Sequence, residues 1–295
     1  MLFEFMIKVE QDKVYIISEK LNCVGLYNLT YDQPIEVEKI QNGYGVKHLE
    51  DEKIDFKIYV DENETSQTSS EFLKVISDVL NISKEQIHFQ KIENGGWDTS
   101  FDDIELENGW VICYSDAVEQ YEGKRVIRFD PLAAFGTGLH ETTQDCLSLI
   151  LNHDFSGQSV LDLGTGSGIL TVGALYKHAI NVKAIDYETV ENEVLHNVQL
   201  NGISTNNVQV LQEDLLNGDF KINKKYDWIF INIGGDETTS IVQRHDLLEK
   251  SDHFLISGLV EWHIEHVIKM FVDVGFTIET KLQTNEWVTI YFKRY

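Results

Sequence analysis

The residues of this sequence best suited to chemistry lie in a glycine-rich turn at residues 160–168, VLDLGTGSG. Its glycines are Gly164, Gly166 and Gly168, and Asp162 stands two residues before the first of them. Glycine between a strand and a helix lets the backbone approach a ligand closely and adopt conformations that other residues avoid. We therefore interpret this turn as the backbone part of a cofactor site.

The spacing of these glycines favours S-adenosylmethionine (SAM) over a dinucleotide. The pattern is G-x-G-x-G, whereas a dinucleotide dehydrogenase more commonly has G-x-G-x-x-G. A dinucleotide needs a helix N-terminus aimed at its pyrophosphate. SAM has no phosphate but carries an ammonium and a sulfonium, so the acidic Asp162 at the end of the strand is favourable there.

A second carboxylate, Asp186, ends the next apolar run, NVKAID, 22 residues after Gly164. A carboxylate at the tip of the second strand can accept hydrogen bonds from both hydroxyls of a ribose. Asp186 alone does not separate SAM from NAD, and a strand-end aspartate can also merely cap the following helix. Because Asp186 follows a glycine turn at this interval, we expect it to bind the ribose. Asp214, after the third run, is a candidate for the adenine edge, although such an aspartate is commonly only solvated.

The elements that must position these residues begin near Val126. Short apolar runs rich in β-branched residues follow from there, with helical patterns between several of them: VIRFD, SVLDLG, NVKAIDY, NVQVLQED, YDWIFINI and HFLISGLV. Such continuous apolarity is typical of parallel strands covered by helices on both faces. The last two runs, FTIETKLQTN and EWVTIYFKRY, are too close in sequence for a helical crossover, so we expect them to pair antiparallel.

A smaller α+β domain is predicted at residues 1–94. Polar and apolar residues alternate through residues 54–60, which is the period of a half-buried strand. Apolar residues recur at helical spacing through residues 72–80, with Ser69 or Ser70 as the N-cap. Another short strand is expected at residues 86–91.

The boundary of this domain is predicted at the turn-forming sequence ENGG, residues 93–96. Residues 95–120 then form an interdomain linker that contains Trp97 and Trp110. Residues 121–295 form the cofactor-binding domain, which includes the glycine turn and Asp186.

Four segments resemble the family of ribosomal protein L11 methyltransferases. They are FDPLAAFGTGLHETT at residues 129–143, VLDLGTGSGIL at 160–170, FINIGGD at 230–236, and the C-terminal sequences LISGLVEWHIEHV and GFTIETKLQTNEWVTIYFKR. ENGGWDTSF and ENGWVICYSD also resemble the interdomain stretch of this family. The resemblance implies a class I methyltransferase with a doubly wound, seven-stranded, mostly parallel, Rossmann-like α/β sheet and a smaller N-terminal α+β domain. It also implies transfer of methyl groups from SAM to lysine or N-terminal amines of ribosomal protein L11.

The resemblance assigns site residues one by one. The family's cofactor contacts correspond here to Thr143, Gly164, Asp186 and Asn232. We expect the loop residues Phe135 and Thr137 to cover the sulfonium, Phe135 through a cation–π contact of about 0.5–2 kcal/mol. Gly166 and Asp162 complete the expected cofactor set.

Asn232 and His140 are the expected catalytic residues. Asn232 would orient the hydrogens of the acceptor amine, and His140 would hydrogen-bond the amine or relay its proton. Without the resemblance, Asn232 would be a strand-end turn residue and His140 a structural loop histidine. The sequence departs from the family at Leu139 and at residues 234–236, which puts the methyl acceptor in doubt.

Composition and charge narrow the class of protein further. The chain has 295 residues, 42% hydrophobic and 25% charged, which is typical of a soluble two-domain protein. No apolar run approaches the about 18 residues of a membrane helix, and the start lacks the pattern of a signal peptide. Three cysteines without metal-type spacing predict a reduced cytoplasmic protein with neither disulfides nor a metal site.

The net charge of −25 argues against general binding to nucleic acid, since phosphates would be repelled. Acidity favours solubility, and it would also attract a basic partner such as a ribosomal protein. We therefore expect a monomer that binds a basic ribosomal protein and contacts neither nucleic acid nor membrane. Three alternatives remain open: a methyltransferase for another protein or a small molecule, a non-catalytic binding protein of the same fold, and an NAD dehydrogenase.

Overall fold

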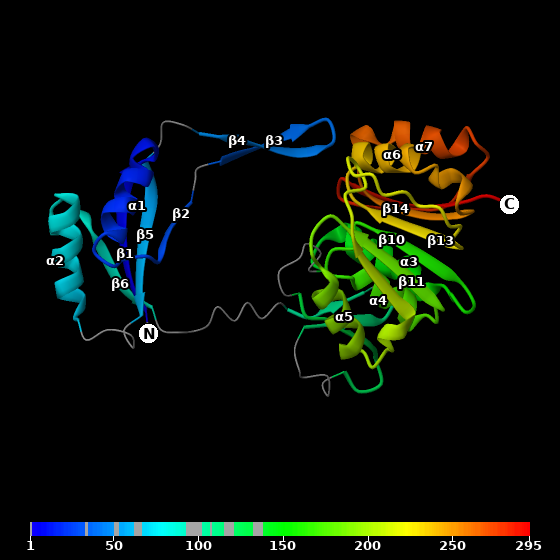
Figure 1. Ribbon diagram of the computed structural model, residues 1–295, viewed down its shortest axis with the longest axis horizontal. Coiled ribbons are helices and arrows are strands. Elements are labelled where there is room, and N and C mark those ends of the chain that lie inside the picture. Colours follow the sequence, from blue (N-terminus) through cyan, green and yellow to red (C-terminus); the bar gives the residue numbers. More distant parts are fainter. Residues whose placement is uncertain are drawn as a thin grey trace. The chain divides into compact units, whose positions relative to one another are not determined.

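The structure is a computed structural model that describes residues 2–32, 35–49, 53–61, 67–92, 102–106, 108–114, 121–131 and 138–295. Its residues group into two compact units. The smaller unit comprises Met1–Ile40 and Tyr44–Thr99, and the larger comprises Gln41–Gly43 and Ser100–Tyr295. Figure 1 labels the main elements of each unit.

A four-stranded sheet forms the centre of the smaller unit, with the strand order β2-β5-β1-β6. Its strands are β1 (Leu2–Glu10), β2 (Leu29–Tyr31), β5 (Lys53–Asp61) and β6 (His88–Ile92), and its helices are α1 (Val14–Asn22) and α2 (Ser69–Leu80). Two further strands, β3 (Ile35–Ile40) and β4 (Gly43–His48), pair with each other. Phe5, Phe56 and Ile76 are fully buried in the core of this unit.

The sequence predicts β5, β6 and the second helix of this unit but misplaces the helix cap. Helix α2 begins after Thr68, whose side chain accepts a hydrogen bond from the backbone N–H of Glu71 while Glu71 bonds back to Thr68. This reciprocal capping box makes Thr68 the N-cap in place of Ser69 or Ser70, because only Thr68 has a glutamate three residues later.

The larger unit is built on a seven-stranded sheet with the order β12-β11-β10-β13-β14-β16-β15. Its strands are β10 (Ser159–Leu163), β11 (Asn181–Asp186), β12 (Val208–Gln212), β13 (Trp228–Asn232), β14 (His253–Val260), β15 (Thr277–Thr284) and β16 (Trp287–Lys293). The first five are parallel, and β16 runs antiparallel to both β14 and β15. This confirms the predicted doubly wound, mostly parallel sheet and its antiparallel C-terminal pair.

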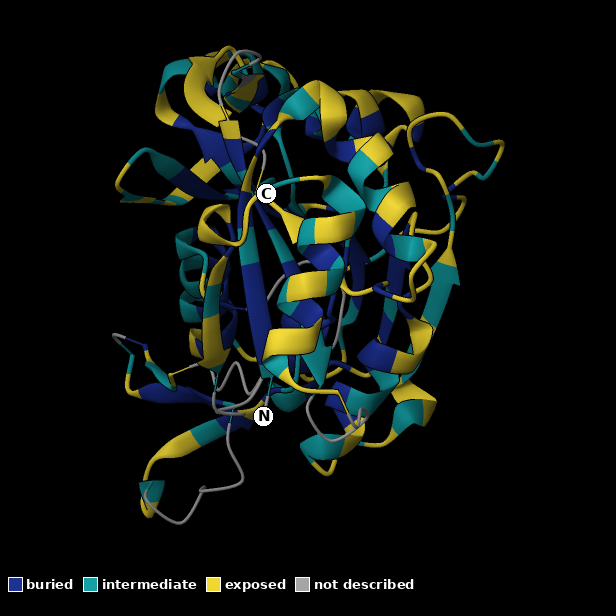
Figure 2. Cartoon of the chain, turned by 90° about the vertical axis from the view of Figure 1, so that its left-hand side faces the viewer, coloured by how far each residue is buried: buried dark blue, intermediate teal, exposed yellow. Residues whose placement is uncertain are grey.

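Helices cover both faces of this sheet, as Figure 1 shows. They are α3 (Glu141–Asn152), α4 (Ile169–Tyr176), α5 (Glu191–Leu200), α6 (Gly235–Arg244) and α7 (Glu265–Val272). Helices α3, α4 and α5 share one buried cluster with Val160 of β10, whereas α6 and α7 share another with the next residue, Leu161. Alternate residues of a strand point to opposite faces, so each face has its own core. In Figure 2 the buried residues accordingly lie along the strands.

One predicted strand belongs to a different sheet. The run VIRFD forms β9 (Arg125–Arg128), which pairs in parallel with β8 (Trp110–Cys113), and β8 pairs with β7 (Ile104–Glu105). Strand β10 already has β11 and β13 as neighbours, so β9 finds no place beside it. Only Ile127 of β9 is fully buried, while both of its arginines are exposed, unlike a strand covered on both faces.

Strands β7 and β8 also lie within residues 95–120, where the sequence predicts a linker. Trp110 and Ile112 are buried, and they pack in the same cluster as helices α3 and α4. The structure thus places ordered strands of the larger unit in this stretch. Residues 93–96, at the predicted boundary, lie outside the described residues.

Short 3-10 helices complete the described elements: η1 (Gln11–Lys13), η3 (Lys84–Gln86), η5 (Thr205–Asn207), η6 (Leu247–Glu249) and η7 (Glu261–His263). Within the described parts of the chain, no helix combines the length and the apolarity needed to cross a membrane.

Candidate cofactor site

The glycine turn connects the end of β10 to the start of α4 in a left-handed backbone path. Gly164, Gly166 and Gly168 have φ angles of 70°, 51° and 81°, which are unfavourable for residues with a side chain. Space is restricted as well, because a Cβ atom on Gly164 would lie 2.8 Å from Ile233 Cγ2 and one on Gly168 would lie 2.9 Å from Val194 Cγ1. The turn therefore requires glycine for both its conformation and its packing.

Asp186 lies directly beside this turn. Its Oδ2 accepts a hydrogen bond of 2.8 Å from the backbone N–H of Gly166, and its Oδ1 accepts one of 3.0 Å from that of Glu188. Each carboxylate oxygen has two lone pairs, so each retains one for a further donor. The two predicted parts of the site, 20 residues apart in sequence, thus lie in hydrogen-bonding contact.

Asp162 is directed into the protein beneath the turn. Its side chain is buried, and its Oδ2 accepts hydrogen bonds of 2.7 Å from Thr165 Oγ1 and 2.7 Å from Thr171 Oγ1. Burial raises the pKa of Asp162 to about 6, and the nearby charge of Asp186 acts in the same direction. Asp162 thereby ties the glycine turn to the first turn of α4, which makes it a positioning residue. Neither threonine is singled out by the sequence pattern, although each lies within nine residues of Asp162.

His140 caps the N-terminus of α3. Its Nδ1 accepts a hydrogen bond from the backbone N–H of Thr142 at 3.3 Å, and its ring packs edge-on against Trp287 with centroids 4.7 Å apart. The same Nδ1 lies 2.8 Å from Thr142 Oγ1, so both contacts of this nitrogen are made with the first turn of α3. Thr143, in the first turn of the same helix, is buried.

Asn232 ends β13 at the same edge of the sheet as the glycine turn. Leu163 of β10 pairs with Ile231 of β13, so Gly164 and Asn232 are the next residues of adjacent parallel strands. Asn232 is half-buried and pairs on its other side with Ser257 of β14. The register therefore brings Asn232 to the predicted site.

Three predicted residues remain: Phe135, Thr137 and Asp214. Phe135 and Thr137 lie outside the described residues. The next residue, Gly138, approaches the start of α4, where a Cβ atom on it would lie 3.1 Å from Ile169 Cδ1. Asp214 accepts hydrogen bonds of 2.9 Å from the backbone N–H groups of Leu216 and Asn217, so it stabilises its own turn.

The arrangement as a whole suits a cationic nucleoside better than a dinucleotide. Helix α4 starts with a left-handed glycine, Gly168, and the turn before it contains no basic side chain. The carboxylate of Asp186 lies at this edge, where it can accept bonds from ribose hydroxyls. The residues present thus fit SAM.

Comparison with known proteins agrees with this geometry. A family model described as ribosomal protein L11 methyltransferase (PrmA) matches residues 2–295. The chain belongs to this family. It is therefore a methyltransferase, and the match extends through the smaller unit, beyond the residues on which the resemblance in the sequence rests.

Relatives described as ribosomal protein L11 methyltransferases align with this chain over most of their length. The ribosomal protein L11 methyltransferase of Bacillus subtilis is 27% identical over 310 residues, covering 99% of both chains. That of Pediococcus pentosaceus is 27% identical over 278 residues, covering 90% of this chain and 86% of the relative. The crystal structure of a ribosomal protein L11 methylase from Lactobacillus delbrueckii subsp. bulgaricus aligns with a TM-score of 0.57 and 25% identity, over 66% of this chain and 100% of that chain.

Proposed function

We propose that this methyltransferase uses SAM to methylate lysine or N-terminal amines of ribosomal protein L11. The observation that carries the proposal is the contact between Asp186 and the glycine turn, in a chain that matches the L11 methyltransferase family from residue 2 to residue 295. Membership of the family supports ribosomal protein L11 as the acceptor. The carboxylate beside the glycine turn supports SAM as the methyl donor.

The cofactor would be held by residues at the carboxyl edge of β10, β11 and β13. The free lone pairs of Asp186 would accept bonds from the ribose hydroxyls, and the backbone at Gly164 would allow close approach. Thr143 and Asn232 would lie toward the methionine end. When bound, SAM supplies a methyl group that its sulfonium has already activated.

The protein's own task is then to hold a neutral amine in line for attack. Holding two reactants in a near-attack geometry can lower the activation barrier by roughly 7–11 kcal/mol. A lysine or N-terminal amine must first lose a proton, and desolvation lowers its pKa and favours that loss. The amide oxygen of Asn232 would accept a bond from a remaining N–H of the amine. His140 would hydrogen-bond the amine or relay its proton.

We further propose that the smaller unit recognises the acceptor protein. It contains none of the predicted cofactor residues, which all lie between residues 135 and 232. The chain carries a net charge of −25, and a basic ribosomal protein would be attracted to such a surface.

The test is to incubate the full chain with methyl-labelled SAM and a cell lysate that lacks this methylation, and to identify the labelled protein. Label in ribosomal protein L11 is the expected result. Label in another protein or in a small molecule would replace the acceptor while keeping the methyl donor. No label in any fraction, with active enzyme of this family labelling the same lysate, would contradict the proposal.

A further inference from the structure

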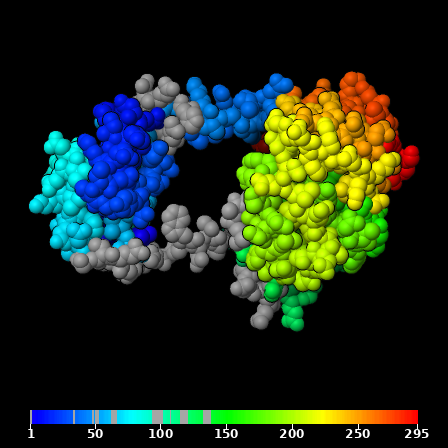
Figure 3. All heavy atoms as spheres, viewed as in Figure 1, coloured from blue at the N-terminus to red at the C-terminus, as the bar shows by residue number. Residues whose placement is uncertain are grey.

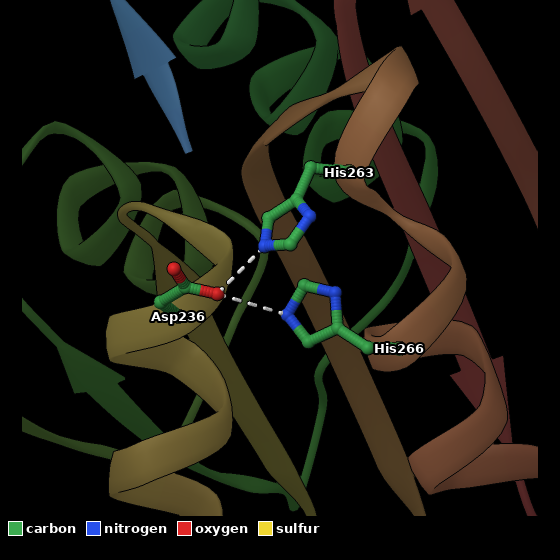
Figure 4. A group of neighbouring side chains, drawn as sticks. All are labelled: Asp236, His263 and His266. Atoms are coloured by element: carbon green, nitrogen blue, oxygen red, sulfur yellow. Dashed lines mark hydrogen bonds and ion pairs between the residues drawn. The ribbon is translucent and has the colours of Figure 1, made fainter. Parts of the chain in front are cut away.

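Two histidines and an aspartate converge near the carboxyl ends of β13 and β14. Asp236 lies in the first turn of α6, which follows β13. His263 ends η7 and His266 lies in the first turn of α7, both of which follow β14. Because β13 and β14 are parallel neighbours, the segments after them leave the sheet at the same edge. Figure 4 shows the three side chains directed toward one another.

The contacts in this cluster join one carboxylate oxygen and two ring nitrogens, and the side-chain amide of Gln41 also lies 3.3 Å from His263 Nε2. Asp236 Oδ1 lies 2.8 Å from His263 Nε2 and 3.3 Å from His266 Nε2. One potential ligand atom from each residue lies within 4.8 Å of the other two. The imidazole rings are close as well, with centroids 4.3 Å apart.

His266 Nε2 is only partly satisfied by the protein. The atom is buried and lies 3.3 Å from Asp236 Oδ1, but within the described residues it makes no hydrogen bond of good geometry. A buried polar atom that lacks a hydrogen bond calls for an explanation.

We propose that Asp236, His263 and His266 bind a divalent cation of the zinc class. Zinc lies about 2.0–2.2 Å from imidazole nitrogens and carboxylate oxygens, so ligand atoms around a tetrahedral ion lie about 3.3–3.5 Å apart. The 3.3 Å separation of Asp236 Oδ1 and His266 Nε2 matches that spacing. The shorter bond to His263 contains a proton, which the metal would replace. Three protein ligands leave one tetrahedral position for water or another ligand.

The donor set decides the class of ion. Imidazole nitrogen favours zinc, cobalt, nickel and copper, whereas magnesium and calcium prefer sites made of oxygen. The overall charge of −25 would raise the local concentration of any divalent cation. Cysteine spacing gave no indication of this site, because none of its ligands is a cysteine.

The three side chains lie near the surface of the larger unit. Helices α6 and α7 lie at its surface, drawn in yellow and orange in Figure 3. The side chain of His263 is 18% exposed, that of His266 34% and that of Asp236 49%, so the cluster lies near solvent although His266 Nε2 itself is buried. The proposal does not depend on methyl transfer, since binding of the ion can be measured alone.

The experiment is a titration of the metal-free full chain with Zn²⁺ by calorimetry and with Co²⁺ by visible absorption. We expect one equivalent of either ion to bind, and Mg²⁺ and Ca²⁺ to give no saturable binding. His263→Ala and His266→Ala should each weaken Zn²⁺ binding by more than about tenfold, since loss of even an outer partner of a ligand commonly costs 10–100-fold. Asp236→Asn should weaken it in the same direction.

A matched control is His196→Ala. His196 Nε2 lies 3.0 Å from Asp130 Oδ2, which is an isolated histidine–aspartate pair of similar geometry, and its loss should leave Zn²⁺ affinity unchanged. The wild-type chain gives a second readout that needs no variant, because bound Zn²⁺ should shift the imidazole NMR signals assigned to His263 and His266. Absence of stoichiometric binding, unshifted signals of these two residues, or unchanged affinity in both folded histidine variants would overturn the proposal.

Discussion

Asp186 is the residue on which the cofactor assignment depends most. It joins the second strand of the sheet to the glycine turn through a bond to the backbone of Gly166. Removal of the side chain would therefore loosen the turn and would also remove the contact that we propose for the ribose. Asp162 differs, because its bonds go to Thr165 and Thr171 inside the protein. We therefore propose that Asp186 contacts the cofactor, whereas Asp162 supports the turn.

Asp186→Ala should weaken SAM binding by more than about tenfold. A hydrogen bond to a charged group contributes roughly 1.5–3 kcal/mol, and each 1.4 kcal/mol is tenfold in affinity. Calorimetry on the folded variant measures the effect. Asp273→Ala is the control, since Asp273 pairs with Lys269 on the exposed end of α7. An unchanged dissociation constant for Asp186→Ala would show that this carboxylate does not hold the ribose.

Asp162 predicts a pH dependence of stability in the absence of ligand. Burial raises the pKa of Asp162 from 3.8 to about 6. Between these values the folded state holds a proton that the unfolded state releases, so this group makes the protein less stable as the pH rises. Asp162→Asn cannot titrate, and its amide oxygen can still accept from both threonines. From pH 5 to pH 7 the free energy of unfolding of the wild type should fall by about 1 kcal/mol relative to the variant.

Urea unfolding at both pH values provides this measurement. A difference between the two proteins that stays constant from pH 5 to pH 7 would contradict the raised pKa of Asp162. A difference that grows in favour of the wild type would reverse its sign, and would mean that the folded protein favours the ionised carboxylate.

At the scale of elements, helix α3 depends on His140 for its N-cap. Alanine cannot cap, whereas asparagine is a good cap, and both substitutions lose the ring contact with Trp287. His140→Ala should therefore be less stable than His140→Asn by about 1 kcal/mol in chemical unfolding. Equal stability would mean that the cap contributes nothing. Loss of methyl transfer in His140→Asn with stability retained would assign the imidazole a part in the chemistry.

Most strands of the larger unit could be predicted from sequence, because parallel strands covered on both faces are almost continuously apolar. The glycine turn and Asp186 could also be paired, since adjacent strands in such a fold end at one edge. Strand β9 has the same type of residues but belongs to another sheet, because sequence patterns give the type of an element and not its partner. Strand β1 and helix α1 were not predicted.

The interactions that could not be predicted depend on where side chains point in the folded chain. Asp236 and His263 are 27 residues apart, and only the packing of α6 beside η7 and α7 brings them together. The sequence predicts a catalytic role for His140, whereas its bond to the backbone of Thr142 becomes visible only in the structure. Short motifs thus locate a site but do not reveal which of its side chains already make hydrogen bonds within the protein.

At the scale of the whole molecule, the division into two units predicts that SAM binding and recognition of the acceptor can be separated. A fragment from Asp102 to Tyr295 keeps Leu106, Trp110 and Ile112, which are buried in the core of the larger unit. We expect it to fold and to bind SAM within a few-fold of the full chain while losing nearly all transfer to L11. Transfer at the full rate would show that the smaller unit does not recognise the acceptor.

A shorter fragment from Tyr121 tests the structural boundary. It lacks β7 and β8, and loss of a large buried side chain typically costs 3–5 kcal/mol. This fragment should therefore unfold at a much lower urea concentration than the fragment from Asp102. Equal unfolding midpoints would show that residues 102–120 act only as a linker.

The claim on which this account rests is that the glycine turn and Asp186 form a SAM site. The most direct test is calorimetric titration of the intact chain with SAM, with its demethylated product and with NAD. The account predicts that SAM and the demethylated product each bind in one equivalent and that NAD gives no saturable heat. Micromolar binding of NAD, without binding of either methyl-donor form, would contradict it.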